Sequence, residues 1–241
     1  MTLNNELLIL MYHQIDKPKA DAKIKGLFTK PSQFEWQIKL LQKNGANFTT
    51  FEEIEEKGMD PERKNVILTF DDGSDCFIKN AFPILNKYKA KSVVYPVFNA
   101  IGEKNVVFEE STNKSTIDLL TNEELIQLNN DGVEIGSHCL NHVHLAEKNE
   151  ETVLTELIDS KKGLEEIIGK EIVSIAYPFG SYNEKVLDLA HQAGYTWAVS
   201  TNPGSNIKKN KLELSRAAVR GYKLSHYFKF WRMAKRELAE A

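Results

Sequence analysis

Apolar runs of strand length alternate with amphipathic stretches of helix length along almost the whole chain of 241 residues. The strand-like runs cover residues 6–12, 66–70, 92–98, 133–137, 172–176, 195–200 and 212–219. A strand followed by a helix, repeated about seven times, predicts parallel strands with helices packed outside them. The chain is therefore expected to form an α/β fold, either a closed (β/α) barrel or a doubly wound sheet.

Helix start and stop signals fill the stretches between these runs. The expected starts are Ser32, Thr121 in a capping box with Glu124, and Asn183, and the expected stops are Gly45, Gly169 and Gly194. The longest helix is expected over residues 150–168, and a final packing helix over residues 225–238 carries Phe228, Trp231 and Met233. Because no linker or internal repeat divides the pattern, residues 1–241 are expected to form one domain.

Charge and cysteine content exclude several classes of protein. The 31 basic and 34 acidic residues are mixed along the chain, so no basic stripe supports nucleic-acid binding. The N-terminal residues lack a basic leader region, and their apolar run is too short to span a bilayer. We expect no transmembrane segment and a cytoplasmic location, although loss of a leader would instead indicate a secreted or cell-envelope protein. Cys76 and Cys139 are expected to be buried free thiols. Nothing in the sequence indicates an oligomeric state.

Acids and imidazoles follow three of the predicted strands. His13 comes after the first run, Asp71 and Asp72 after the second, and His138 after the fourth, with His142 four residues later. In both candidate architectures the ligand site lies beyond the carboxyl ends of the strands. These side chains are therefore expected to meet at one rim of the fold.

His138, His142 and one of the adjacent aspartates, Asp71 or Asp72, are predicted to hold a divalent metal. Two imidazoles four residues apart share one face of a helical turn, and with a carboxylate they make a three-ligand site with an open position. Zn²⁺ is the expected ion, with Co²⁺, Ni²⁺ or Fe²⁺ as alternatives, because such an ion lowers the pKa of bound water from about 16 towards about 7. The alternative interpretation is a capped turn at the aspartates and solvated loop histidines. His144 is expected to lie beside the ligands or at the surface, with a place in the ligand set as the alternative.

Other residues are predicted to transfer protons and to hold the substrate. The aspartate that does not bind the ion is the predicted base, and His13 is the predicted acid for a departing amine, with a purely structural hydrogen bond as the alternative for His13. Arg216 lies in an apolar run and needs a carboxylate partner, for which Asp71 is the candidate. The Tyr177 N–H could face a developing oxyanion while the Tyr177 and Phe179 rings wall a groove. A buried aromatic turn is the alternative for Tyr177.

These motifs resemble those of the polysaccharide deacetylases with a NodB-type domain, carbohydrate esterase family 4. TFDDG at residues 69–73 is similar to the first family motif, and SHCLNHVHL at 137–145 to the second. MYHQI at 11–15 and AYPFGSYN at 176–183 are similar to the branch that de-N-acetylates poly-β-1,6-N-acetylglucosamine, in which the acid histidine lies on the N-terminal side. The resemblance implies a distorted (β/α)₇ barrel, an N-acetylated glycan substrate, and metal-dependent deacetylation with Asp71 as base, Asp72 as ligand and His13 as acid.

The chain departs from the family pattern at three places. Cys139 stands where the family usually has Ser or Thr, and Val143 and His144 stand where Pro and an acid or amide are common. No arginine precedes Tyr177, so Arg216 is the expected substitute. These departures leave the preferred metal and substrate open.

Three other functions fit parts of the pattern. A C–N hydrolase of the same fold could act on a formamide, a cyclic imide or a ureide, and two histidines with a carboxylate also bind Fe(II) in non-haem oxygenases. The second aspartate and the strand–helix alternation disfavour the oxygenase, and the intact set of acids and histidines disfavours a glycan-binding module without catalysis. The sequence has no GxSxG, HExxH or phosphate-binding glycine loop, which disfavours serine hydrolases, zincins and nucleotide-dependent enzymes.

Overall fold

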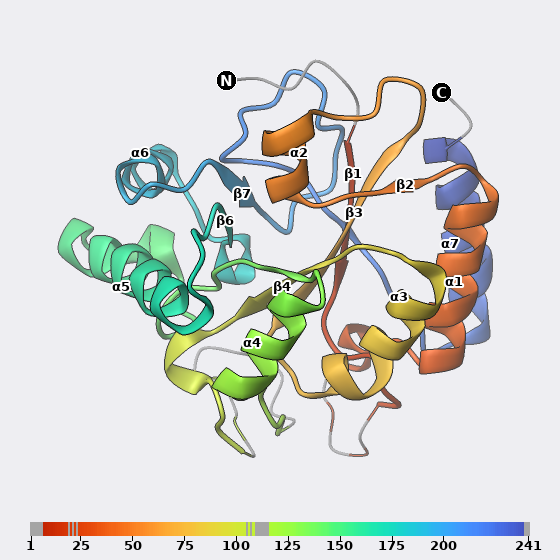
Figure 1. Ribbon diagram of the computed structural model, residues 1–241, viewed down its shortest axis with the longest axis horizontal. Helices are drawn as coiled ribbons and strands as arrows, with labels where there is room; N and C mark the ends of the chain where they lie inside the picture. The colour runs from red at the N-terminus through yellow and green to blue at the C-terminus, as the bar shows by residue number, and fades with distance from the viewer. Residues whose placement is uncertain are drawn as a thin grey trace.

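The computed structural model describes residues 7–238 except 19, 21, 23, 105, 107 and 109–115. Its strands are β1 (Leu7–Tyr12), β2 (Asn47–Phe48), β3 (Asn65–Asp72), β4 (Val93–Pro96), β5 (Glu134–Ile135), β6 (Ser174–Ala176), β7 (Trp197–Val199) and β8 (Ala217–Ala218). Its α-helices are α1 (Pro31–Lys43), α2 (Phe51–Lys57), α3 (Phe82–Tyr88), α4 (Asn122–Asn130), α5 (Glu150–Ile168), α6 (Glu184–Gln192) and α7 (Leu224–Leu238). Figure 1 shows these helices arranged around the strands.

The strands close into a distorted barrel. Every pair of strands that the structure describes runs parallel, in one sheet of order β5-β4-β3-β1-β8, with β2 beside the start of β3, and a second sheet of β6 and β7. Parallel bridges between Ser137 and Ile175 and between Val199 and Leu214 join the two sheets at both seams. Because Leu214 belongs to the segment that continues into β8, the ring closes, and the fold is the barrel rather than the open sheet.

Both faces of the barrel strands are apolar, for two different reasons. Alternate residues of β1 and β3, such as Leu8 and Leu68, pack outward under the helices, whereas Ile9 and Ile67 pack inward with Phe51 of α2. A strand that is buried on both faces needs apolar residues at consecutive positions, and β1 and β3 have such continuous apolar runs in the sequence. None of the helices in the described part of the chain is long and apolar enough to cross a bilayer.

The predicted elements are largely confirmed. Each of the seven strand-like runs contains one observed strand, although Glu6 lies outside the described residues. The capping box of Thr121 and Glu124 is present, and the helix predicted over 150–168 has these bounds, with Gly169 in the left-handed conformation after it. The two-residue strand β2 was not predicted, because two residues are too short to show a period.

The predicted cap of α1 is wrong. Ser32 lies inside the helix, which begins at Pro31 with Lys30 as the preceding residue. A proline suits the first helical position because its φ is already near the helical value and its missing N–H would have had no partner there. The helix therefore begins with a proline and has no side-chain cap of the kind expected from Ser32.

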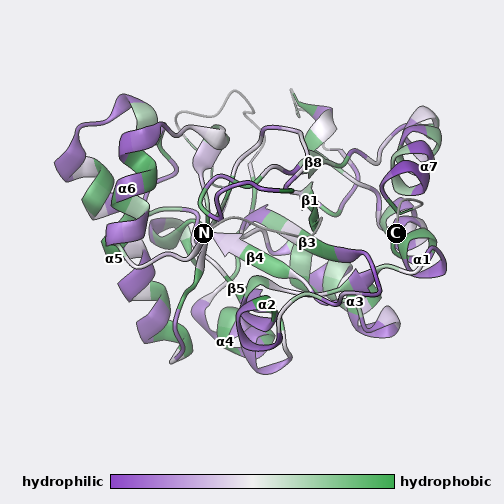
Figure 2. Cartoon of the chain, turned by 90° about the horizontal axis from the view of Figure 1, so that it is seen from above, coloured by the Kyte–Doolittle hydropathy of each residue, from purple (hydrophilic) through white to green (hydrophobic). Residues whose placement is uncertain are grey.

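The final helix packs, but not through the two aromatic residues predicted to do so. In α7, which lies beside α1 (Figure 2), Phe228 is 60% exposed and Trp231 is 37% exposed. The buried residues are His226, Phe230, Ala234 and Leu238, and their spacing of four places them on one helical face. Met233 is partly buried against the core.

A buried carboxyl group near the N-terminal end of the barrel makes stability depend on pH. Glu134 is 2% exposed, and its oxygens accept hydrogen bonds from the Glu52 N–H and the Ser174 hydroxyl. Burial raises the pKa of Glu134 to about 7. Because this pKa lies above the ordinary value of 4.5, the folded state binds the proton more tightly, and stability is lost as pH rises through this interval.

We predict that Glu134→Gln stabilises the protein more at pH 8 than at pH 4.5, because the neutral amide avoids a buried charge. The difference in the free energy of unfolding between variant and wild type is expected to be about 2–3 kcal/mol more favourable at pH 8. Urea unfolding at the two pH values measures this difference. Glu171→Gln, at a side chain 72% exposed, is the control and is expected to change neither value. An unchanged pH dependence in Glu134→Gln would refute the prediction.

Candidate active site

Strand β3 carries two adjacent aspartates to the carboxyl end of the barrel. Asp72 adopts a φ of 73° and Gly73 a φ of 71°, and a Cβ on Gly73 would lie 2.8 Å from the Pro96 Cα. Four of the six non-glycine residues with positive φ in the described chain belong to this region: Asp72, Cys139, His142 and Phe179. Such backbone strain is retained where the surrounding structure enforces it, and it is concentrated here around one cluster of polar side chains.

Arg216 binds Asp71 through two hydrogen bonds. Its Nη1 donates to Oδ1 at 2.6 Å and its Nη2 to Oδ2 at 2.8 Å, while its Nε donates to the Ser200 carbonyl and its Nη1 also to the Thr69 hydroxyl. Burial is the largest single effect and would raise the pKa of Asp71. The Arg216 charge, the neighbouring His138 and His13 and the Arg216 hydrogen bond together outweigh burial, and the pKa falls to about 2. The predicted contact between these residues is confirmed, and Asp71 is ionised at neutral pH.

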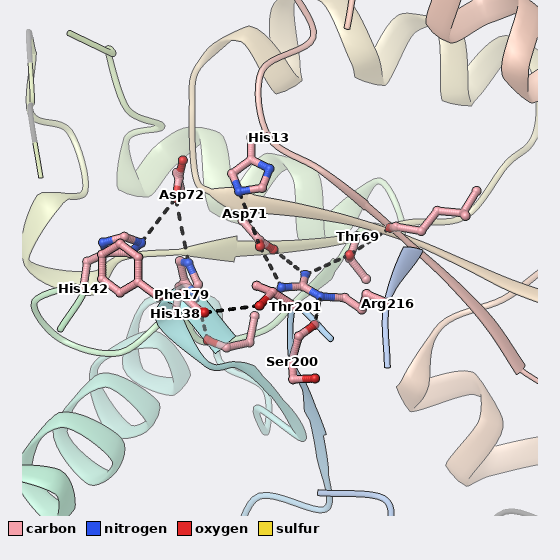
Figure 3. A network of polar contacts seen from close by, with 12 residues as sticks. His13, Thr69, Asp71, Asp72, His138, His142, Phe179, Ser200, Thr201 and Arg216 are labelled. Atoms are coloured by element: carbon pink, nitrogen blue, oxygen red, sulfur yellow. Dashed lines mark hydrogen bonds and ion pairs between the residues drawn. The ribbon is translucent and has the colours of Figure 1, made fainter. Parts of the chain in front are cut away.

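The three predicted metal ligands converge beside this pair (Figure 3). Oδ1 of Asp72 lies 3.8 Å from Nε2 of His138 and 3.6 Å from Nε2 of His142. One potential ligand atom from each residue lies within 4.8 Å of the others. Bonds of about 2.0–2.2 Å to one central ion are compatible with donors spaced in this way.

The chemistry of this donor set fits a divalent cation. Nδ1 of His138 is 2.6 Å from the Ala176 carbonyl oxygen and donates to it, so Nε2 keeps its lone pair facing Asp72. Burial lowers the pKa of His138 and lowers that of His142 to about 2, whereas burial raises the pKa of Asp72. Two neutral imidazoles and a largely buried carboxylate with no cationic side chain bound to it are the groups that an ion would stabilise.

The two histidines lie on a loop rather than on the predicted helical turn. Cys139 and His142 both have positive φ, which no regular helix contains. The loop is held by Glu156 of α5, whose carboxylate accepts from the N–H groups of Leu140 and Asn141 at 2.9 Å each. Sequence reasoning missed Glu156, although a buried acid beside the apolar stripe of the long helix was a possible signal.

His13 and the metal-ligand group share one cavity of about 150 Å³. The Nε2 of His13 lies 3.9 Å from Oδ2 of Asp71, and the side chain is 18% exposed. The cavity is also lined by Gln14, Ile24, Leu27, Val106, Phe108, Ile117, Phe179 and Thr201. Of these, only Phe179 was predicted from the sequence to line a groove. The cavity thus has a polar floor of acids and imidazoles and a largely apolar wall.

Comparison with known proteins identifies this arrangement. A family model described as polysaccharide deacetylase matches residues 58–198, which is more than half of the chain. The chain belongs to the polysaccharide deacetylase family. The matched stretch contains Asp71, Asp72, His138 and His142, whereas His13 and Arg216 lie outside it. As a member of this family the chain is a hydrolase of N-acetyl amide bonds.

Alignments with individual deacetylases cover more of this chain than the family model does. YxkH of Bacillus subtilis is 30% identical over 203 residues, an alignment that covers 83% of this chain and 66%, just under two thirds, of YxkH. A poly-β-1,6-N-acetyl-D-glucosamine N-deacetylase of Staphylococcus aureus is 28% identical over 250 residues, covering 94% of this chain and 83% of the relative. The structure of the Streptococcus pyogenes deacetylase PplD, in complex with acetate, superposes with a TM-score of 0.78 at 28% identity and covers 90% of this chain and 94% of its own.

One residue predicted for the deacetylase site lies outside it. Tyr177 is fully buried, its N–H donates to the Val199 carbonyl within the barrel, and its hydroxyl donates to the Leu212 carbonyl. Its N–H is therefore unavailable to an oxyanion and its ring does not line the cavity, so the buried aromatic turn is the correct interpretation. Phe179 does line the cavity, and His144 stacks on it at 3.9 Å, outside the ligand group.

We predict that Arg216→Gln lowers the free energy of unfolding at pH 7 by about 3 kcal/mol, because it leaves a buried carboxylate without its cation. With the Asp71 pKa at about 2, below its ordinary 3.8, the pair contributes stability above pH 3.8 that is lost as pH falls towards 2. Urea unfolding at pH 7 measures the loss. The matched control is the double variant Asp71→Asn/Arg216→Gln, which is expected to recover part of the stability, and a double variant no more stable than Arg216→Gln would contradict the argument.

Proposed function

We propose that this chain removes N-acetyl groups from a glycan containing N-acetylglucosamine, with a divalent metal, Zn²⁺ in the first instance, as cofactor. The observation that carries the proposal is the convergence of Asp72, His138 and His142 beside the ionised Asp71, within one cavity. The substrate class is supported by the Staphylococcus aureus relative that is named for poly-β-1,6-N-acetyl-D-glucosamine and aligns with 94% of this chain.

Asp72, His138 and His142 would hold the metal. When bound, a divalent cation supplies a Lewis acid that lowers the pKa of water and polarises the acetyl carbonyl. Asp71 accepts the proton that the attacking water loses. Arg216 keeps Asp71 ionised, and because Arg216 is anchored to Ser200 and Thr69, it also keeps the carboxylate in one orientation.

His13 supplies the proton that the leaving group needs. The water oxygen forms a bond to the acetyl carbon, the C–N bond breaks, and the amine nitrogen takes a proton from His13, so the products are acetate and a free amine. His13 and Asp71 come from neighbouring strands, and the 3.9 Å between Nε2 and Oδ2 lets the proton taken up by Asp71 return to His13 directly or through one water.

The shape of the cavity fits a small group at the end of a larger substrate. Its volume of about 150 Å³ suits an acetamido group with part of a sugar ring rather than a polymer. Phe108, Phe179 and Leu27 supply apolar surface for a methyl group and a sugar face. The glycan chain would therefore lie across the mouth, with one N-acetyl group inserted.

We predict that Asp71→Asn retains bound metal but lowers the rate of acetate release by about 10³-fold or more, because the amide cannot accept the proton of water. His142→Ala is the contrasting variant and is expected to lose the metal itself. Elemental analysis of both proteins and acetate release from N-acetylglucosamine oligomers measure the two properties. Equal turnover by Asp71→Asn and wild type would eliminate Asp71 as the base, and release of formate or ring-opened product in place of acetate would transfer the proposal to another C–N hydrolase.

We also predict that His13→Asn lowers kcat by about 10²–10⁴-fold with bound metal unchanged, because the amine then leaves without a proton. Steady-state rates of acetate release, together with metal content, test this. A variant with the wild-type kcat would show that another group is the acid.

A further inference from the structure

Helix α7 presents an apolar and basic surface to solvent, here called the α7 patch: Leu224, Phe228, Trp231, Arg232 and Lys235. Leu224 is 85% exposed, Phe228 60% and Trp231 37%. Six large apolar side chains are exposed in the described part of the chain, and three of them lie on this one helix of 15 residues. Exposed apolar side chains that gather on one element indicate an interaction site, whereas scattered ones are ordinary.

The residues of the patch share one side of the helix. Leu224, Phe228, Trp231 and Lys235 follow the spacing of four, three and four that lines one helical face. The Phe228 and Trp231 rings stack with centroids 5.9 Å apart, and the Lys235 ammonium lies 4.6 Å from the Trp231 ring. Since Phe230 and Ala234 already bury the core-facing side, the patch is not required for packing the helix onto the barrel.

The charge of α7 is opposite to that of the whole protein. The helix carries four basic side chains and one acidic one, whereas the full chain has a net charge of -3. Within the described residues, Lys229, Arg232 and Lys235 form no ion pair with a carboxylate. These cations are therefore available to an anionic partner.

Two possible occupants fit the patch poorly. A second copy of the chain, docked with twofold symmetry, would place Arg232 and Lys235 close to the same cations of its partner, and like charges repel. A hydrophilic polyanion would use the charges but would leave Leu224 and Phe228 in water. A bilayer surface with anionic headgroups satisfies both features, because apolar side chains enter the interface while lysine and arginine side chains remain at headgroup level.

We propose that α7 docks the protein on the surface of a membrane containing anionic lipids, with Leu224, Phe228 and Trp231 at the level of the interface and the neighbouring cations on the headgroups. The helix lies at the side of the barrel beside α1 (Figure 1), and none of the residues that line the cavity belongs to it. Docking through α7 thus leaves the cavity uncovered. This inference is independent of the proposed reaction.

Binding of the full chain to vesicles tests the proposal. The protein is expected to sediment with vesicles of phosphatidylcholine and phosphatidylglycerol, and not with phosphatidylcholine alone, and to dissociate as salt is raised. Leu224→Ser/Phe228→Ser is expected to lower the partition coefficient about tenfold or more. The matched control is Ile126→Ser/Ile207→Ser, which removes two exposed apolar side chains elsewhere, 40% and 46% exposed, and should bind as the wild type does.

The charges are tested separately. Arg232→Gln/Lys235→Gln is expected to weaken binding to anionic vesicles about tenfold, and the control Lys57→Gln/Lys185→Gln, at side chains 67% and 52% exposed, is expected to leave it unchanged. Acetate release from a small soluble substrate should be equal in all four variants, since none of these residues lines the cavity. Circular dichroism verifies that each variant is folded.

A measurement on the unaltered patch guards against a variant that fails to fold. Brominated lipids are expected to quench the fluorescence of Trp231, and Trp231→Phe should remove most of the quenched component. Of the other two tryptophans, Trp197 is fully buried and Trp36 is half-buried against Tyr227 and Phe230. Equal binding to neutral and anionic vesicles, or the absence of quenching, would overturn the proposal. If salt abolishes binding but Leu224→Ser/Phe228→Ser does not weaken it, the partner of the patch is a soluble polyanion. If the protein is a dimer without vesicles and this variant is a monomer, the partner is a second copy of the chain. Either result would refute the membrane as the partner.

Discussion

The buried ion pair of Asp71 and Arg216 is the interaction on which the rest of the site depends. Arg216 lies between Leu214, which bridges to β7, and Ala217, which pairs with β1, so it occupies the segment that closes the barrel. Its two hydrogen bonds to Asp71 connect that segment to β3 across the fold. The Arg216 charge also contributes to the low pKa of Asp71, about 2, against the opposing effect of burial. One pair of side chains therefore links the closing segment of the barrel to the proposed base.

Adjacent positions on a strand explain how neighbouring aspartates come to have different environments. Successive side chains of a strand point to opposite faces, so Asp71 meets Arg216 while Asp72, with its positive φ, meets the two imidazoles. Burial acts to raise the pKa of both aspartates. The pKa of Asp72 is raised, whereas that of Asp71 is lowered, since only Asp71 has a cationic side chain bound to it. A cation bound beside Asp72 would lower its pKa as Arg216 lowers that of Asp71. This is the electrostatic reason to assign the metal to the side of Asp72.

The molecule divides into a family-wide centre and features outside it. The family model spans residues 58–198 and includes the four residues of the two central motifs. His13, Arg216 and helix α7 lie beyond those limits, directly after the first strand and in the last segments of the chain. The flanking parts thus contribute the proposed acid, the cation that orients the base and the proposed membrane surface.

The sequence by itself determined the strand and helix alternation, the seven strand runs and the residues of the candidate metal site, because periodicity, helix caps and short motifs are local properties of the chain. Only the tertiary structure decided that the strands close into a ring, since two seams depend on bridges between distant segments. It also decided that Tyr177 is buried, that Glu156 shapes the histidine loop, and that α7 packs through Phe230 rather than Phe228. Each of these depends on which distant residue stands opposite, and a pattern of neighbours along the chain contains no such information.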